Sequence, residues 1–289
     1  MSATSIGSSE ATAGMPPAFG IEARPAPDPT PRGWSAARIG GYAIAAIWLG
    51  VLALLLFYLV SVFSPEFMKR YGPRYLNGLW TTLLLVGISV GIGGLLSLPL
   101  ALARLSAIPF LNGPALAYTT FFRGTPLIAQ TFLVYYGLGA LNAELKSIGL
   151  WWFFREAWYC AIFTFSLHTA AYQAEILRGA IRTVPNGQRE ASKAMGLSRW
   201  TTFRKIILPQ ALIVALRPYG NEIVLLIKAS AIVAVITVYD LMGQTRFVFS
   251  RSFDFQAYLW AALLYLAIVE VLRRLWDVLE GRLTRHLKR

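Results

Sequence analysis

The sequence predicts an all-α polytopic membrane protein, folded as a helical bundle. The chain of 289 residues is 56% hydrophobic and only 14% charged, whereas an ordinary globular domain carries about 25% charged residues. Its apolar residues form six runs that we predict to be transmembrane helices. Its basic residues gather at the ends of these runs. The net charge of +13 therefore indicates membrane topology and contact with anionic lipid, and not nucleic acid binding.

The first two segments are a polar tail and a first apolar span. Residues 1–38 are rich in Ala, Pro, Gly and Ser without apolar periodicity, which predicts a disordered cytoplasmic tail. They lack the charged start and apolar centre of a signal peptide, so we expect no cleavage. Residues 39–63 contain no charged side chain and would span about 37 Å as a helix, enough to cross a bilayer.

The second and third predicted spans carry glycines and polar residues. Residues 81–103 hold Gly87 and Gly91 at a small-xxx-small spacing, followed by another glycine pair, which suits close helix packing in lipid. The next apolar run, 127–141, is too short to cross alone, so we expect a helix from about Leu116 that is kinked at Pro126. Arg123 on this helix either reaches the cytoplasmic surface or holds a carboxylate of a neighbouring helix.

The fourth span, residues 158–181, contains two polar features. Glu175 and Arg178 are three apart and can pair at the water boundary. His168 lies in the middle of the span, where a histidine either bonds a second helix or belongs to a transport pathway. Gln130 of the preceding helix is a second candidate for that pathway.

The fifth span, residues 216–241, places three polar side chains among Ile, Val, Leu and Ala. Asn221 and Lys228 share one helix face, and Glu222 points about 100° away. Charges at this depth normally face a bundle interior or a wet cavity. We therefore expect a candidate substrate path with Lys228 at its centre, the alternative being a structural ion pair with a carboxylate such as Glu175.

The sixth span, residues 255–272, ends at Glu270, with Arg273 and Arg274 placed to pair with it. The basic end of the chain, with 280–289 as its cytoplasmic tail, is predicted to lie on the inner leaflet. Its apolar face is then formed by Leu275, Trp276, Leu279, Leu283 and Leu287.

A polar insert between the fourth and fifth spans, residues 186–209, is predicted to form two short helices joined by a bend. Asn186 can cap the first helix, and Gly196 lies where a helix ends in a left-handed residue. Ser198 can cap a second helix, which Pro209 ends or kinks. Composition alone also fits a plain basic loop that anchors its neighbours by the positive-inside effect.

The residues of this insert resemble the EAA loop of ABC importer membrane subunits. The resemblance rests on Glu190-Ala191-Ser192, Gly196, Ile206 and Leu208-Pro209; Ser192 replaces an alanine of the family pattern. The motifs Phe122-Arg123-Gly124-Thr125-Pro126-Leu127, Tyr172-Gln173-Ala174-Glu175 and Gly220-Asn221-Glu222 resemble the polar amino-acid permeases of the histidine, arginine and glutamine importer group. The resemblance covers residues 76–279.

The resemblance implies a fold, partners and a mechanism. The fold would be a five-helix type I importer core with one extra N-terminal helix. Two such permease subunits, the same or related, would form the path above an ABC ATPase dimer. A periplasmic or lipid-anchored binding protein would deliver the amino acid. Glu190, Ala191, Ser192 and Gly196 would contact the ATPase, and Leu208 and Pro209 would tie this joint to the membrane helices.

We predict that the protein lies in the inner membrane of a bacterial cell. Six spans then place both termini and the 186–209 loop in the cytoplasm. This topology leaves some basic residues on the outside, against the general bias: Lys69, Arg70, Arg74, Lys146, Arg155, Arg246 and Arg251.

The chain is not expected to be an enzyme. None of its lysines follows a glycine, so the phosphate-binding element is absent and ATP with magnesium would be bound by the partner ATPase. No cysteine–histidine cluster suggests a metal. A rival interpretation is an ion-coupled secondary transporter of small polar solutes, but the sequence shows no repeated halves. A purely structural membrane anchor would not need charges inside a span.

Overall fold

The computed structural model describes residues 35–62 and 64–285 and divides into two units, residues 1–58 and 59–289. Helix α1 (Ala36–Val62) belongs mostly to the first unit, and its apolar length is sufficient to cross a membrane. It starts at Ala36, three residues earlier than predicted. The predicted disorder of residues 1–38 is therefore wrong at 36–38, which are helical, and residues 1–34 lie outside the described residues.

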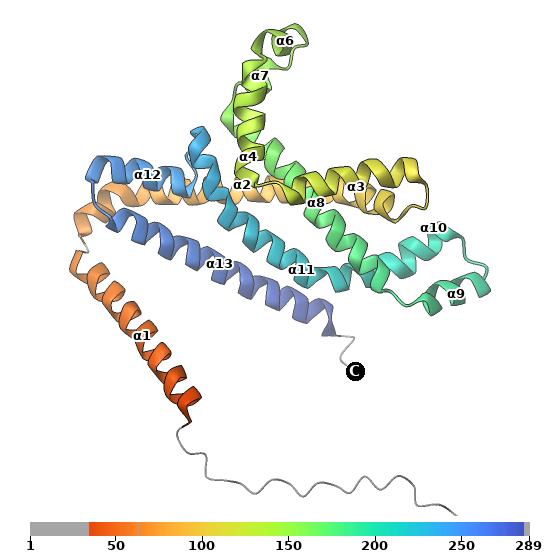
Figure 1. Ribbon diagram of the computed structural model, residues 1–289, viewed down its shortest axis with the longest axis horizontal. Coiled ribbons are helices and arrows are strands. Elements are labelled where there is room, and N and C mark those ends of the chain that lie inside the picture. Colours follow the sequence, from red (N-terminus) through yellow and green to blue (C-terminus); the bar gives the residue numbers. More distant parts are fainter. Residues whose placement is uncertain (1–34, 63, 286–289) are drawn as a thin grey trace, which may run out of the picture. The chain divides into compact units, whose positions relative to one another are not determined.

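The second unit is organised around α2 (Pro65–Leu105) (Figure 1). The Ser64 hydroxyl accepts a hydrogen bond from the Phe67 amide at 3.3 Å and Pro65 opens the first turn, both of which favour a helix start. The helix begins 16 residues before the predicted span 81–103. At 41 residues it is about 60 Å long, twice the thickness of a bilayer core.

A break separates α3 (Pro109–Gly124) from α4 (Leu127–Phe132), so the single kinked helix predicted from Leu116 is wrong. Thr125 and Pro126 both have extended backbones, with ψ of 146° and 135°. Proline disfavours helical geometry in the residue before it, and here that preference ends the helix at Gly124 instead of bending it. Figure 1 shows α3 and α4 running in different directions.

The chain then forms an excursion away from α2 (Figure 1). A π-helical turn, η1 (Leu133–Gly137), and α5 (Leu138–Ala140) extend α4. Two short helices, α6 (Asn142–Ser147) and α7 (Trp151–Phe154), lead to α8 (Ala157–Thr183). The segment 127–140 is apolar but shorter than the three described helices that can span a bilayer.

Helices α2 and α8 pack side by side through Gly93, where a Cβ atom would lie 2.4 Å from Thr169 Cγ2. This close approach requires glycine. At Gly87 and Gly91, the pair predicted from spacing, an added Cβ atom would have no neighbour within 4 Å. Their face is therefore not a helix contact among the described residues of this chain.

Helix α11 (Leu208–Ala229) continues into a 3-10 segment, η3 (Ser230–Ile236). Thr237 then adopts a left-handed φ of 65° and ends the predicted span 216–241 early. A further helix, α12 (Leu241–Ser252), follows. Asp240 caps it, its carboxylate accepting from the Gly243 amide at 2.8 Å.

The last helix, α13 (Gln256–Leu283), runs through the predicted span 255–272 and on into the basic tail. Up to Leu283 the tail is thus a continuation of α13, and its position on the leaflet stays a prediction. Trp276 packs on α11 instead, where its Nε1–H donates to the Leu216 carbonyl oxygen at 2.7 Å. Arg217 and Glu280 join the same two helices at 2.8 Å. Leu287 lies outside the described residues.

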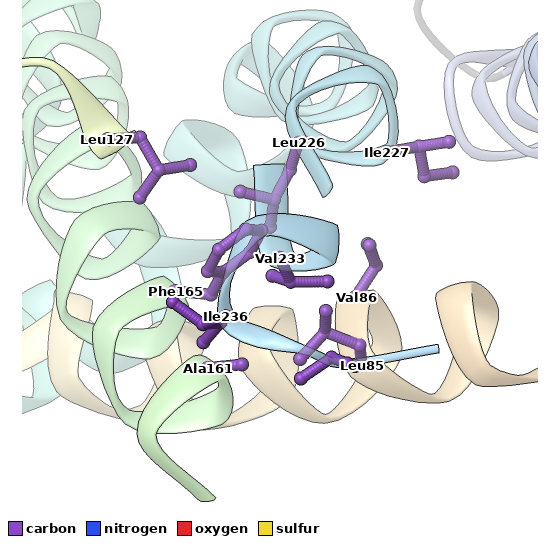
Figure 2. Close-up of a cluster of buried hydrophobic side chains, with 10 residues drawn as sticks. Leu85, Val86, Leu127, Ala161, Phe165, Leu226, Ile227, Val233 and Ile236 are labelled. Carbon is purple, nitrogen blue, oxygen red and sulfur yellow. The ribbon is translucent and has the colours of Figure 1, made fainter. Parts of the chain in front are cut away.

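Three apolar clusters hold the second unit together. The first joins Leu85 of α2, Phe165 of α8, Leu226 of α11 and Ile236 of η3 (Figure 2). The second fastens the C-terminal end of α8 and the N-terminal end of α11 to α2, and the third packs the start of α2 against α12 and α13. Among the described helices, residues 36–58, 65–105 and 199–236 are long and apolar enough to cross a membrane; the six-span count stays a prediction.

Candidate functional site

The loop between α8 and α11 forms a helical corner. Helix α9 (Asn186–Ala194) ends two residues before Gly196, whose φ is 72°. The Gly196 amide donates to Lys193 O at 3.0 Å and the Leu197 amide to Ser192 O at 3.0 Å, which is the Schellman pattern. The predicted left-handed bend at Gly196 is confirmed.

The second half of the loop joins the membrane helix without a break. Ser198 accepts from the Thr201 amide at 3.1 Å and caps α10 (Arg199–Thr202), as predicted. A π-helical turn, η2 (Phe203–Ile207), then leads directly into α11. Pro209 therefore does not end the helix; it is the second residue of α11, and the π-helical turn directly before it is where the helix departs from regular α geometry.

One predicted cap is wrong. Asn186 is the first residue of α9, and Pro185 occupies the capping position without a side-chain hydrogen bond. Proline fixes its own backbone near the conformation that a helix entry needs. The loop is tied back to α8 by a different contact, a 3.3 Å hydrogen bond from the Arg189 guanidinium to the Ile181 carbonyl oxygen.

The loop presents both polar and apolar side chains to the surface. Glu190 and Ala191 are accessible, and Met195 and Trp200 are 65% and 64% exposed. Ser192 is fully buried, and its hydroxyl donates to the Gln188 carbonyl at 2.6 Å. A serine in place of the expected alanine therefore leaves no unsatisfied polar group. Exposed apolar residues on a charged loop are typical of a protein contact surface.

An arginine–glutamate cluster lies at the end of α8 that carries this loop. Glu175 Oε1 is 2.9 Å from Arg104 Nε of α2, and Glu175 Oε2 is 2.6 Å from Arg178 and 3.9 Å from Arg123 of α3. Arg104 also bonds Asn112. The predicted Glu175–Arg178 pair is confirmed. Of the two alternatives predicted for Arg123, the structure shows the second, contact with a carboxylate of a neighbouring helix. Glu175 thus joins three helices beside the loop.

Gln130 and His168 form one hydrogen-bonded network at the α3–α4 break. Gln130 Nε2 donates to the Phe122 carbonyl at 2.9 Å and to Thr125 Oγ1 at 2.7 Å, and Gln130 Oε1 lies 3.0 Å from His168 Nδ1. The amide therefore satisfies a carbonyl that the broken helix leaves unpaired. His168 makes the predicted helix-to-helix bond.

The three polar residues of α11 divide as their spacing predicts. Asn221 and Lys228 are exposed in the single chain, and Glu222 is buried. Glu222 Oε1 accepts from Thr169 of α8 at 3.3 Å. Among the described residues, no carboxylate lies within 4.0 Å of the Lys228 ammonium group; the suggested partner Glu175 is held by arginines.

The comparisons with known proteins decide the family. The family described as "Binding-protein-dependent transport system inner membrane component" matches residues 93–285. The chain belongs to this family. It is a transport component of the membrane, a permease subunit of the ABC importer class. The matched region includes the cluster at Glu175 and the whole 186–209 loop, and it begins after α1.

Two relatives are permease proteins that match most of this chain. The nopaline transport system permease protein NocM of Agrobacterium fabrum is 40% identical over 217 residues, covering 75% of this chain and 90% of that protein. The histidine/lysine/arginine/ornithine transport system permease protein HisM of Escherichia coli is 40% identical over 218 residues, covering 75% and 91%.

Solved structures show the same permease fold. An amino acid ABC transporter, crystallised with histidines, matches with a TM-score of 0.67 and 32% identity, over 76% of this permease and 99% of that chain. The MetNI methionine ABC transporter, in an inward-facing conformation, matches with a TM-score of 0.63 and 21% identity, over 77% and 100%; the second match bears on fold alone.

Two features of the permease were not predicted from its sequence. The helix α12 lies in the connection between the predicted fifth and sixth spans, where no helix was expected, although Asp240 three residues before Gly243 is a capping signal. The joining of Glu175 to α2 was also missed, because nothing in the sequence pairs Arg104 with residue 175. Among the described residues, no three His, Cys, Asp or Glu side chains gather as a metal site.

Proposed function

We propose that this permease translocates a polar amino acid in an ATP-driven importer, and that the 186–209 loop receives the energy from an ATPase. One observation carries the proposal. Helix α9 is an exposed element with a hydrogen-bonded end that connects through α10 and η2 to a membrane helix without a long intervening loop. A push on α9 would therefore reach the membrane core.

The proposed contact with the ATPase uses both the polar and the apolar side chains of the loop. Glu190 and Ala191 would enter a groove of the ATPase together with Met195 and Trp200, which otherwise expose apolar area to water. Gly196 would hold the angle between α9 and α10, and Leu208 and Pro209 would pass the motion to α11. ATP and magnesium would be bound by the ATPase and not by this chain.

The Glu175 cluster extends this connection to the other helices. It lies on α8 about three helical turns before α9, and its arginines come from α2, α3 and α8. Arg104 and Glu175 are largely buried and resist separation, because each would be left unpaired, and the exposed Arg123 adds a weaker contact from α3. Movement of α9 would therefore move α2 and α3 with α8 as one body.

The proposed path for the substrate runs beside α11. Lys228 is exposed on the same face as Asn221 and lacks a described carboxylate partner, so a substrate carboxylate would satisfy it during passage. Glu222, Gln130 and His168 are buried or bonded to each other and would support the wall of the path. The second permease subunit would cover this open face, and a binding protein would deliver the amino acid.

The proposed orientation puts both termini and the loop in the cytoplasm. It agrees with the basic character of the loop and with the family's dependence on a binding protein outside the membrane. The rival function, ion-coupled secondary transport, predicts uptake driven by a sodium or proton gradient without an ATPase.

Co-purification separates the two functions. We expect the tagged permease to retain an ATPase subunit encoded beside it through size-exclusion chromatography. The variant Glu190→Lys should release that subunit. Lys193→Glu, on the same helix, serves as the charge-change control. Release by both variants to an equal degree would indicate general electrostatics. Failure of the wild-type chain to bind any ATPase would contradict the proposal.

A further inference from the structure

A polar cavity lies at the end of α8 opposite to the loop. It has a volume of about 440 Å³, which falls in the range of small-ligand sites, about 300–1,000 Å³. Its walls come from separate segments of the chain, so it is a product of the fold and not of one loop. The lining residues are Thr81, Tyr135, Arg155, Glu156, Ala157, Trp158, Thr237, Val238, Tyr239 and Gln244.

Two opposite charges lie side by side in this cavity. Arg155 Nε is 3.3 Å from Glu156 Oε1, and their side chains are 57% and 53% exposed. Glu156 occupies the capping position of α8, yet its carboxylate caps no backbone amide. An exposed pair of this kind contributes little to stability. Each group can therefore leave the other and bind a ligand instead, with little loss of stabilising free energy.

The neighbouring wall is aromatic. Tyr135, Trp158 and Tyr239 contribute to the lining of the same cavity. The faces of such rings attract cations, and tryptophan does so most strongly. A ligand with a positive or guanidinium-like side chain would suit such a wall. Thr81 and Gln244 of the lining carry no charge; the Thr81 hydroxyl donates to the Asn77 carbonyl oxygen, and Gln244 Oε1 accepts from Arg74.

We propose that this cavity binds an amino acid with a cationic side chain, Arg155 holding the carboxylate and Glu156 the α-ammonium group. The two charged groups of an amino acid are attached to one carbon atom, which matches the adjacent guanidinium and carboxylate. The ion pair opens and each member takes the oppositely charged group of the ligand.

This inference rests on the proposed function and on its orientation, which puts the cavity at the outer end of the permease. There it would receive the amino acid from the binding protein, before the ligand reaches Lys228. Selection for a cationic side chain would then be exercised by the permease as well as by the binding protein.

The experiment measures binding to the permease–ATPase complex in nanodiscs without binding protein. The probe is whichever of radiolabelled L-arginine, L-lysine or L-histidine the reconstituted importer takes up. Its amide lacks the carboxylate, and its N-acetyl derivative lacks the ammonium group. The variants are Arg155→Gln and Glu156→Gln, and Arg251→Gln is the matched control, an exposed arginine outside the cavity that rests on Phe247.

The expected result is a crossed pattern. In the wild-type complex and in Arg251→Gln, amidation and acetylation each weaken binding at least about tenfold, as loss of a charge-assisted hydrogen bond implies. Arg155→Gln binds the amino acid more weakly by a similar factor. In this variant the amide binds no more weakly than the amino acid itself, whereas the N-acetyl derivative still binds more weakly. In Glu156→Gln the N-acetyl derivative binds no more weakly than the amino acid, whereas the amide still binds more weakly. Arg155→Lys, which keeps the charge, retains sensitivity to amidation.

Other results overturn the inference. They include uptake of the probe without binding to the complex, equal affinities of Arg155→Gln and Arg251→Gln, or a full amidation penalty in Arg155→Gln. Absence of uptake of every probe by an importer that takes up another polar amino acid also overturns this inference, whereas absence of ATP-driven uptake of any polar amino acid contradicts the proposed function itself.

Discussion

Replacement of Gly220 by alanine tests how α13 is fastened to α11. Gly220 is buried in α11, and an added Cβ atom would lie 2.4 Å from Cδ1 and 2.5 Å from Nε1 of Trp276. These distances are far below normal contact, so the indole ring must move. Its movement would break the 2.7 Å hydrogen bond that Nε1–H donates to the Leu216 carbonyl.

The magnitude follows from three terms. Overpacking of a tight contact costs about 1–3 kcal/mol, and the lost hydrogen bond costs about 1 kcal/mol. Alanine in place of a helical glycine returns about 1 kcal/mol. The free energy of unfolding should therefore fall by about 1–3 kcal/mol, which lowers the melting temperature of a domain of this size by about 2–12 °C.

The single cysteine provides the assay. Cys160 is fully buried, so a thiol-reactive fluorescent dye reports unfolding of the detergent-solubilised chain without any engineered label. Gly281→Ala is the matched control, because this glycine lies in α13 with nothing within 4 Å of its added Cβ; it should melt at or above the wild-type temperature. Equal melting temperatures for Gly220→Ala and Gly281→Ala would contradict the tight packing of Trp276 on α11.

Four further predictions concern the loop, the path, the cluster and the tail. Gly196→Val places a β-branched residue at a φ of 72°, a strain of about 1–2 kcal/mol or more, and should lower uptake per ATP hydrolysed, with Gly187→Ala in α9 unaffected. Lys228→Met should abolish uptake while the protein still folds and assembles; normal uptake would exclude the lysine from the path. Arg104→Gln should lower the melting temperature more than Arg123→Gln, since Arg104 is 12% exposed and 2.9 Å from Glu175 whereas Arg123 is 45% exposed and 3.9 Å away; the opposite order would contradict the cluster. Removal of residues 1–31 should leave ATP-driven uptake near normal, because the family match begins at residue 93, and loss of uptake by the inserted, truncated protein would show a direct role.

Local chemistry could be predicted from the sequence. Gly196, Ser198 and the Glu175–Arg178 pair depend on neighbours within five residues, so their geometry follows from short-range rules of capping and helix spacing. The division of α11 into an open face with Asn221 and Lys228 and a buried Glu222 likewise follows from helical periodicity. The all-α membrane fold follows from composition and the long apolar runs.

Contacts between distant segments could not be predicted in this way. Gly93 packs on Thr169, and Trp276 on Gly220, because the tertiary fold brings those helices together. The same limit applies to the cluster, where Arg104 lies 71 residues from Glu175 in sequence. The break at Thr125–Pro126 shows a second limit. Proline allows a kink or an end, and here the amide of Gln130 stabilises the end by bonding the freed Phe122 carbonyl.

The central claim is that ATP energy enters the membrane helices through the 186–209 loop. It is tested by uptake of a radiolabelled cationic amino acid into proteoliposomes that contain the permease, its ATPase and its binding protein. We expect uptake that requires ATP and is indifferent to sodium and proton gradients. We further expect Glu190→Lys to abolish uptake in correctly inserted protein. Uptake driven by an ion gradient without ATP, or wild-type uptake by Glu190→Lys, would contradict the claim.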